Sequence, residues 1–343
     1  DALRRRLDHS LYGYTDMPAD FWPTVTKWIA DHHQWNVDSE WMRFIPGIVK
    51  GIGFVVNVFC KPDEKVIIQP PVYHPFRLTP LGNKRQVVMN PLIMNEDGSY
   101  SMDFEGLAKV ADEKCRVLIL ANPHNPAGIV WDVDTLSRLA DFCSERGIIV
   151  ISDEIHCDMA HKGFKHHPFA SVSERAAQCS ITFGAPSKTF NIAGIVSSYC
   201  VVPNEELRRP FFEWLDANEL SEPTIFSPIA TVAAFQNGEE WRQQMLEYVE
   251  ANIDFVDNFL KTRIPQIKAL RPQASFLIWL NCRDLNLDHD ALNRLFVDGA
   301  RLALNDGEMF GEEGRGFMRM NIASPRAVLQ DAMERLEQAV KAL

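Results

Sequence analysis

The sequence lacks any apolar stretch that could cross a membrane, and its cysteines form no recognised pattern. A membrane helix needs roughly 20 consecutive apolar residues, whereas the apolar runs at 117–121 and 148–151 end after only a few residues. The seven cysteines are scattered, odd in number and without a C-x-x-C spacing, which is typical of free thiols in a reducing compartment. We therefore expect a cytoplasmic protein with no membrane partner.

The sequence also has fewer basic than acidic residues. The chain has 35 Lys and Arg residues against 46 Asp and Glu residues, for a formal net charge of -11. Nucleic-acid binding depends on neutralising phosphates with Lys and Arg, so this surplus of acidic residues argues against it. We expect no nucleic-acid partner.

Two common ligand-binding patterns are missing as well. The segment Gly51-Ile52-Gly53 follows no predicted strand and completes no G-x-G-x-x-G motif, so a dinucleotide site is not predicted. His161, His166 and His167 fall in a predicted loop without the spacing of metal ligands. We expect no metal site.

Short apolar runs that alternate with helical patterns are the main signal that is present. Continuous apolar strands separated by helices predict a largely parallel sheet covered on both faces, and hence the α/β class. Helices are expected at 103–113 and 132–146. The predicted strands are 66–69, 86–89, 117–121, 148–152, 181–183 and 198–202.

The pattern changes after Pro223, where long helical segments at 225–236 and 239–264 precede strands at 276–280 and 316–322 and a helix at 326–343. A length of 343 residues is more than one compact core usually takes. We therefore expect a large domain over 13–241 and a smaller α+β domain over 242–343. Residues 1–12 are interpreted as the remainder of an N-terminal segment.

The residues whose side chains are suited to binding or catalysis come directly after the predicted strands. In an open parallel sheet, ligands bind beyond the carboxyl ends of the strands. Four segments occupy such positions: Pro70-Pro71-Val72-Tyr73, Asn122-Pro123-His124-Asn125-Pro126-Ala127-Gly128, Asp153-Glu154-Ile155-His156 and Gly184-Ala185-Pro186-Ser187-Lys188-Thr189-Phe190-Asn191. Together they supply a lysine, a carboxylate, an amide and an aromatic ring.

That set of groups suits a pyridine aldehyde cofactor. Such a cofactor needs an amine to hold its aldehyde and an anion to keep its ring nitrogen protonated. Lys188 and Asp153 fit these two requirements. Either residue alone has an ordinary explanation as a solvated lysine or a helix cap, so the prediction depends on their occurring together.

Three motifs, N-P-H-N-P-A-G, S-D-E-I-H and A-P-S-K-T-F-N-I-A-G, resemble in their order the class I/II aminotransferase superfamily. More narrowly, they are similar to its cystathionine β-lyase branch, the MalY/PatB-type C–S lyases. The similarity runs from Tyr12-Gly13-Tyr14 through the segment at 311–322 to the C-terminus. The resemblance implies the aspartate-aminotransferase-like fold, fold type I, and pyridoxal 5′-phosphate (PLP) as cofactor.

The resemblance also implies a role for each matching residue. Lys188 would form the covalent link to the PLP aldehyde and then act as base at the substrate Cα. Asp153 would pair with the ring nitrogen, Asn125 would donate to the phenolic oxygen, and Tyr73 would stack on the ring. Lys188, Asp153 and Tyr73 are thus the predicted catalytic residues. His156 either supports this group or is a buried core histidine.

The cofactor phosphate needs backbone N–H groups at a helix N-terminus. We expect the turn Lys50-Gly51-Ile52 to supply them, with Ser187 as a further ligand. Many aminotransferases place an arginine eight residues after the lysine to bind the phosphate, but this sequence has Val196 there. The phosphate must therefore be held in another way.

The resemblance extends to the substrate and to a second subunit. Arg319 matches an arginine that binds the substrate α-carboxylate, for which a guanidinium is well suited. Tyr14 matches a tyrosine that reaches the phosphate of the neighbouring subunit, which implies a homodimer with shared active sites. His74, beside Tyr73, is a candidate substrate contact that could protonate a departing sulfur. In the family a further N-terminal segment also contributes to the substrate pocket.

The leading functional hypothesis is a C–S β-lyase that converts cystathionine or cysteine S-conjugates to a thiol, pyruvate and ammonia. An aminotransferase using the same site is the first alternative, because both reactions begin by removing the Cα proton. A regulatory protein that keeps the PLP pocket is the alternative from another class. The intact Lys188 argues for retained chemistry.

Overall fold

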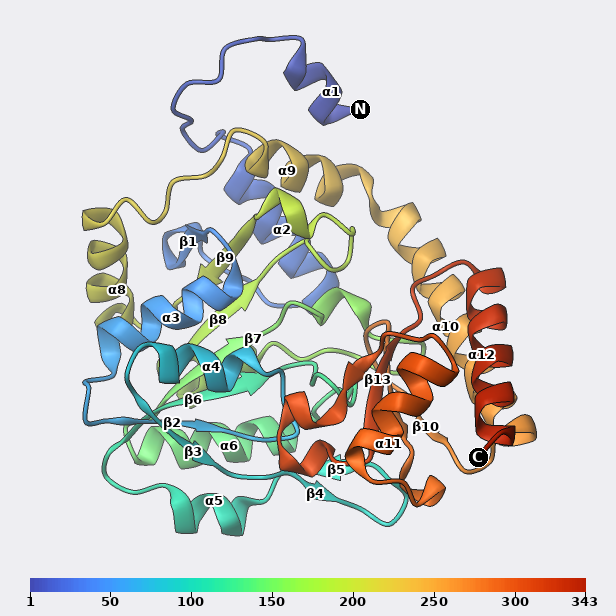
Figure 1. Ribbon diagram of the computed structural model, residues 1–343. Coiled ribbons are helices and arrows are strands. Elements are labelled where there is room, and N and C mark those ends of the chain that lie inside the picture. The colour runs from blue at the N-terminus through green and yellow to red at the C-terminus, as the bar shows by residue number, and fades with distance from the viewer.

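A seven-stranded sheet forms the centre of the computed structural model, which describes residues 1–343 (Figure 1). Its strand order is β1-β9-β8-β7-β6-β2-β3. The strands are β1 (Met42–Ile45), β2 (Lys65–Ile68), β3 (Gln86–Met89), β6 (Cys115–Ala121), β7 (Ile149–Asp153), β8 (Ser180–Gly184) and β9 (Ser198–Val201). All neighbours pair in parallel except β8 with β9 and β1 with β9.

The predicted mostly parallel α/β sheet is confirmed, and all six predicted strands occur within about two residues of their expected bounds. The edge strand β1 was not predicted. Its four residues, Met-Arg-Phe-Ile, are too short and too mixed to stand out, and Arg43 lies partly exposed at the sheet edge. Pairing with β9, more than 150 residues later, completes this strand.

Alternate residues of the central strands enter two separate cores, one on each face of the sheet. In β6, Val117 and Ile119 face one core, whereas Leu118 and Leu120 face the other, as the two-residue period of a strand requires. The helices over the first face are α3 (Ile48–Phe59), α4 (Pro75–Gly82) and α8 (Glu205–Ala217), and those over the second are α5 (Phe104–Val110), α6 (Val133–Glu145) and α7 (Glu174–Gln178). Burial on both faces explains the continuous apolar runs in the sequence.

The last hundred residues build a second, four-stranded antiparallel sheet with the order β10-β11-β13-β12. Its strands are β10 (Lys268–Leu270), β11 (Leu277–Asn281), β12 (Asn305–Asp306) and β13 (Phe317–Asn321). The helices α10 (Glu239–Arg263), α11 (His289–Arg294) and α12 (Arg326–Lys341) enclose its separate core. Helix α10 runs unbroken through residues 241 and 242. The expected domain boundary there stays a prediction.

The two sheets are joined by aromatic side chains. Trp279 of β11 stacks on Phe317 of β13, with ring centroids 5.0 Å apart, and both belong to the core under α6. Phe310 packs edge-on against Trp279 at 5.3 Å. This shared apolar contact fixes β13, and therefore Arg319, against the central sheet.

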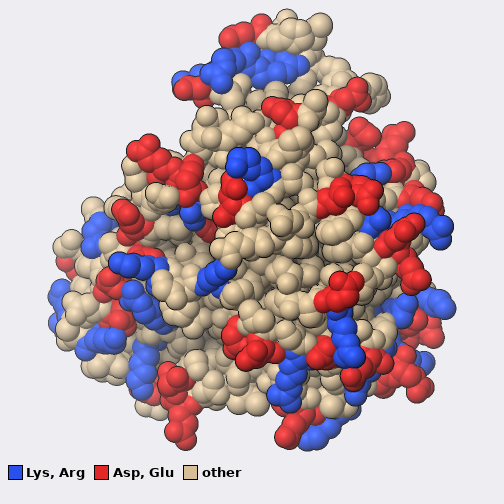
Figure 2. Space-filling model, turned by 180° about the vertical axis from the view of Figure 1, so that it is seen from behind, with Lys and Arg blue, Asp and Glu red and all other residues tan.

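The N-terminal residues 1–15, the projecting segment, stand apart from the body of the molecule (Figure 1). Its helix α1 (Ala2–Leu7) buries no residue and contacts α9 (Ser227–Asn237), whereas α2 (Phe21–His33) is packed into a core with β1 and β9. Arginine side chains gather on the projecting segment beside acidic ones, and charges of both signs are also mixed over the rest of the face shown (Figure 2). None of the helices has the length and apolar character needed to cross a bilayer.

Candidate active site

One cavity of about 550 Å³ collects most of the predicted site residues at the carboxyl ends of the parallel strands. Eight of them line it: Lys50, Tyr73, Asn125, Asp153, His156, Ser187, Lys188 and Arg319. Tyr73 follows β2, Asn125 follows β6, and Asp153 ends β7. The cavity therefore lies where an open parallel sheet is expected to bind its ligand.

Asp153 contributes a carboxylate without an ion pair to the lining of this cavity. The side chain is only 8% exposed and accepts a hydrogen bond from the backbone N–H of Ile155 at 3.1 Å. Burial raises the pKa of Asp153 to about 7, although the Ile155 N–H and the charge of Lys188 oppose this rise. A cation facing Asp153 would favour its charged form, which is what a protonated pyridine nitrogen provides.

Lys188 is positioned by the turn that follows β8. The N–H of Phe190 donates to the carbonyl of Pro186 at 2.9 Å, and that of Ile192 donates to the carbonyl of Ser187 at 3.0 Å. The strand before this turn ends at Gly184, where a Cβ would lie 2.5 Å from the ring of Tyr199. Glycine is required there because no side chain fits between β8 and β9.

Arg319 presents a guanidinium that is only partly satisfied. It donates to Asn125 Oδ1 at 2.8 Å and to Asn305 Oδ1 at 2.7 Å, while its buried Nε has no partner. Burial lowers its pKa to about 10, so the side chain remains a cation at neutral pH. Two amide oxygens thus orient an arginine whose charge is not paired, an arrangement suited to a carboxylate ligand.

Asn305 was not predicted from the sequence. It lies in the two-residue strand β12, in register with Arg319 on β13. No motif surrounds it, and only the pairing of these strands reveals its contact with the arginine.

His156 lines the same cavity, and its buried Nδ1 has no hydrogen-bond partner. Burial lowers its pKa to about 3, and the charges of Lys188 and Arg319 act in the same direction. The ring is therefore neutral at physiological pH and can accept or donate a single hydrogen bond at each nitrogen. The unpartnered nitrogen is free to bond with a ligand in the cavity.

The predicted phosphate turn overlaps the start of helix α3, and its role in phosphate binding stays a prediction. Helix α3 begins at Ile48, after Gly47, so the N–H groups without a helical acceptor belong to Ile48, Val49 and Lys50. The N–H of Gly51 already donates to the carbonyl of Gly47 at 3.0 Å.

Gly51 and Ile52 are packing residues. A Cβ at Gly51 would lie 2.6 Å from the ring of Phe183, and Ile52 is fully buried. Of the three predicted positions only Lys50 lines the cavity, together with Gly47, Ile48 and Val49. The expected helix N-terminus exists, but its free N–H groups, at residues 48–50, begin two residues before the predicted turn at 50–52.

Two more predicted residues lie outside the cavity within this chain. His74 borders a neighbouring cavity instead, and Tyr14 is fully exposed on the projecting segment. Val196, which stands where many aminotransferases have a phosphate-binding arginine, lines the main cavity. Its backbone is left-handed, with φ +58°.

The groups that the cavity presents match those that PLP and an amino acid require. They are a lysine amine, a buried carboxylate without a cation, the free N–H groups at the start of α3 and an arginine with an unpartnered Nε. A family model described as aminotransferase class I and II matches residues 4–336. The chain belongs to the class I and II aminotransferase family.

Relatives within this family match almost the whole chain. Cystathionine beta-lyase PatB of Bacillus subtilis is 38% identical over 99% of this chain and 88% of that protein. Protein MalY of Escherichia coli is 31% identical over 100% of this chain and 88% of that protein. A solved structure of cystalysin from Treponema denticola, which contains PLP, has a TM-score of 0.96 and 34% identity over 99% of this chain and 86% of that one. The predicted fold type I is thereby confirmed.

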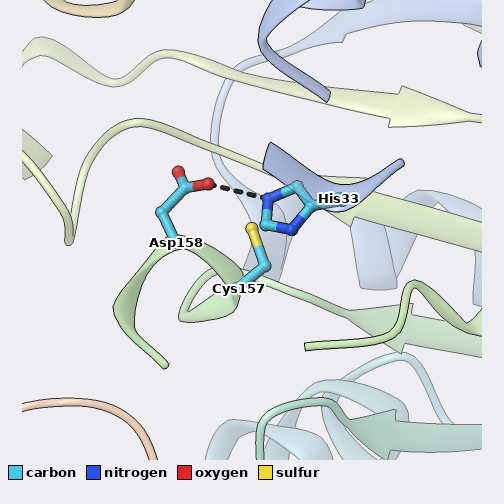
Figure 3. Close-up of side chains that lie close together, drawn as sticks. All are labelled: His33, Cys157 and Asp158. Carbon is cyan, nitrogen blue, oxygen red and sulfur yellow. Dashed lines mark hydrogen bonds and ion pairs between the residues drawn. The ribbon is translucent and has the colours of Figure 1, made fainter. Parts of the chain in front are cut away.

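In this aminotransferase-family chain, a buried hydrogen bond ties α2 to residues 157–158 (Figure 3). Asp158 accepts hydrogen bonds from Trp28 Nε1 at 3.0 Å and from His33 Nε2 at 2.8 Å. Thr189, next to Lys188, also donates to Asp158, at 3.5 Å. Burial raises the pKa of Asp158, but the bonds from His33 and Trp28 outweigh it and lower the pKa overall. Asp158 thus connects α2 to the lysine turn.

Cys157 lies beside this pair, so that ligand-type atoms of His33, Cys157 and Asp158 are all within 4.8 Å of one another (Figure 3). The hydrogen bond between His33 and Asp158 accounts for their proximity. Burial raises the pKa of the Cys157 thiol well above its usual value. We therefore assign the cluster a structural role, and the expectation of no metal stays a prediction.

We predict that Asp158→Ala lowers the free energy of unfolding by about 3 kcal/mol, because it leaves buried donors of Trp28 and His33 without an acceptor. The measurement is urea unfolding followed by fluorescence. The matched control is Asp63→Ala in an exposed turn, which should change stability by less than about 0.5 kcal/mol. Equal effects of the two substitutions would contradict the structural role of Asp158.

Proposed function

We propose that this chain is a PLP-dependent C–S β-lyase that cleaves cystathionine or other S-substituted cysteines to a thiol, pyruvate and ammonia. The main support is that Lys188, Asp153 and Arg319, whose Nε has no hydrogen-bond partner, line one cavity. The relative at 38% identity supports the lyase over the aminotransferase, since it is named a cystathionine beta-lyase.

Several residues are suited to hold PLP in this cavity. Lys188 would bond to the aldehyde, Asp153 would face the ring nitrogen, and Tyr73 would cover the ring. Asn125 would donate its Nδ2–H to the phenolic oxygen, because its Oδ1 already accepts from Arg319. The first turn of α3 and Ser187 would bind the phosphate. When bound, PLP supplies the electron sink for the pair left at Cα.

The substrate is then oriented and deprotonated by two side chains. Arg319 binds the α-carboxylate, which can accept a hydrogen bond from the unpartnered Nε–H. The amine of Lys188 would take the proton from the substrate Cα. The Cβ–S bond breaks, the sulfur leaves as a thiolate, and water converts the remaining three-carbon fragment to pyruvate and ammonia.

His74 is less suited to protonate the departing sulfur than the sequence suggested. Burial lowers the pKa of His74, and the charges of Arg319 and Arg77 lower it further. A neutral imidazole is a poor acid at physiological pH. We propose instead that His74 borders the path of the substrate side chain.

The decisive experiment supplies L-cystathionine or S-ethyl-L-cysteine to the PLP-loaded protein without any keto acid. We expect sustained release of pyruvate and thiol in equal amounts, and loss of both in Lys188→Ala because no amine remains to take the Cα proton. Turnover that requires an added keto acid, and converts it to an amino acid, would assign the chain as an aminotransferase.

We predict that Asp153→Asn retains PLP, seen by absorbance, but lowers kcat for S-ethyl-L-cysteine by roughly 100-fold or more. The amide fills the same space without the charge that favours a protonated ring nitrogen, and lost electrostatic contacts of this kind cost about 10²–10³ in kcat. Asp63→Asn serves as the control. Near-normal kcat in Asp153→Asn would exclude the proposed role.

We also propose a homodimer in which Tyr14 reaches the site of the partner subunit. Leu11, Tyr12 and Tyr14 are exposed on the projecting segment, and exposed apolar side chains gathered in one place are typical of an interface. Tyr14 lines no cavity shared with Lys188 in its own chain. A second copy would cover these side chains.

Sedimentation should give a dimer, and mixed subunits should complement each other. A hybrid of Tyr14→Phe and Lys188→Ala subunits has one site free of both changes, so mixing should raise the activity above the mean of the two parent proteins. A monomeric wild type, or activity that equals the mean, would contradict the shared site.

A cytoplasmic location is also proposed. It is supported by the seven cysteines, which are all free and buried, as is usual in a reducing compartment. A native disulfide in the purified protein would contradict it.

A further inference from the structure

A second cavity, of about 340 Å³, lies next to the main one. Its lining includes His74, Arg77, Met89, Phe310, Glu312 and Glu313. It therefore combines a cation, two carboxylates and apolar surface. No residue of this cavity also lines the main one.

Side chains that contact one another line the two cavities from opposite sides. Tyr73 lines the main cavity and His74 the second, and their rings are 5.1 Å apart. On the other side, Arg319 faces the main cavity while its Cζ lies 4.7 Å from the centroid of the Phe310 ring, which lines the second cavity. Arg319 thus lies against a side chain that lines the second cavity.

The charged residues of the second cavity are not used by the fold. Arg77, from α4, and Glu312 and Glu313, from the loop before β13, form no ion pair within the chain. The neighbouring Arg315 is already bound to Glu308 at 2.9 Å. These three charges therefore remain available to a ligand.

The backbone of this loop makes room for one of the carboxylates. Gly311 adopts φ +126°, and a Cβ there would lie 2.6 Å from Oε2 of Glu313 and 2.8 Å from Pro70. A side chain at position 311 would displace the carboxylate from the cavity edge. The glycine thus supports the observed placement of Glu313.

We propose that the second cavity binds the distal α-amino-acid group of a thioether substrate such as L-cystathionine. Arg77 would bind the distal carboxylate, for which a guanidinium fork is suited, and Glu312 and Glu313 would bind the distal ammonium. Met89 and Phe310 would contact the methylene groups between them. Charges of both signs in one cavity favour a zwitterion over a purely anionic or apolar group. This inference rests on the proposed lyase function.

The test uses four substrates that share the same cysteine half. L-cystathionine carries both distal charges, S-(3-carboxypropyl)-L-cysteine only the carboxylate, S-(3-aminopropyl)-L-cysteine only the ammonium, and S-propyl-L-cysteine neither. The kcat/KM of each is measured by pyruvate release for the wild type and for variants of the second cavity. S-propyl-L-cysteine reports the reaction without any distal charge.

Arg77→Gln should lower kcat/KM about tenfold for the two substrates with a distal carboxylate, relative to S-propyl-L-cysteine, through a higher KM. The double variant Glu312→Gln, Glu313→Gln should do the same for the two substrates with a distal ammonium. Arg209→Gln, on the exposed face of α8, is the matched control and should leave these ratios at their wild-type values.

Two outcomes would overturn the subsite while leaving the lyase intact: all four substrates react equally well in the wild type, or the Arg77 variant affects all four alike. If no thioether releases pyruvate, the proposed function fails, and calorimetry of L-cystathionine binding then decides the inference. About tenfold weaker binding by Arg77→Gln would support the subsite, and equal affinity would overturn it.

Discussion

The site depends on the register of three parallel strands. Ala121 of β6 pairs with Asp153 of β7, which pairs with Phe183 of β8, so the three strands end in one row. The polar segments that follow them therefore start side by side, and Asn125, Asp153 and Lys188 meet in one cavity although more than 60 residues separate the first from the last. A shift of one residue in this pairing would turn Asp153 to the opposite face of the sheet.

Buried hydrogen bonds fix the segments that follow these strand ends. Glu154, directly after Asp153, accepts from Ser152 Oγ and from the backbone N–H of Phe169, both at 2.8 Å, and contacts His166 Nε2 at 2.9 Å. Asp158 binds α2 to the same region from the other side. Buried polar groups are costly unless paired, so these two carboxylates leave few alternative arrangements for the turn that carries Asp153.

The second sheet contributes the substrate side of the site. Stacking of Trp279 on Phe317 fixes β13 against the central body, and pairing of β12 with β13 puts Asn305 beside Arg319. The same loop that leads into β13 supplies Glu312 and Glu313 to the second cavity. The cofactor-binding groups thus come from the parallel sheet, and the groups proposed to select the substrate come largely from the contact between the two sheets.

The sequence by itself determined the α/β class, six strands of the central sheet and the residues at their ends, because apolar periodicity and the motifs after each strand are local features. It also pointed to Lys188, Asp153 and Arg319. It could not place the start of α3, where Gly51 proved to be a packing residue, or identify Asn305. Nor could it pair His33 with Asp158, 125 residues away, or bring Arg77 to the cavity of Glu312. Those relationships join segments distant in the chain, and only the packing of helices and sheets against one another decides them.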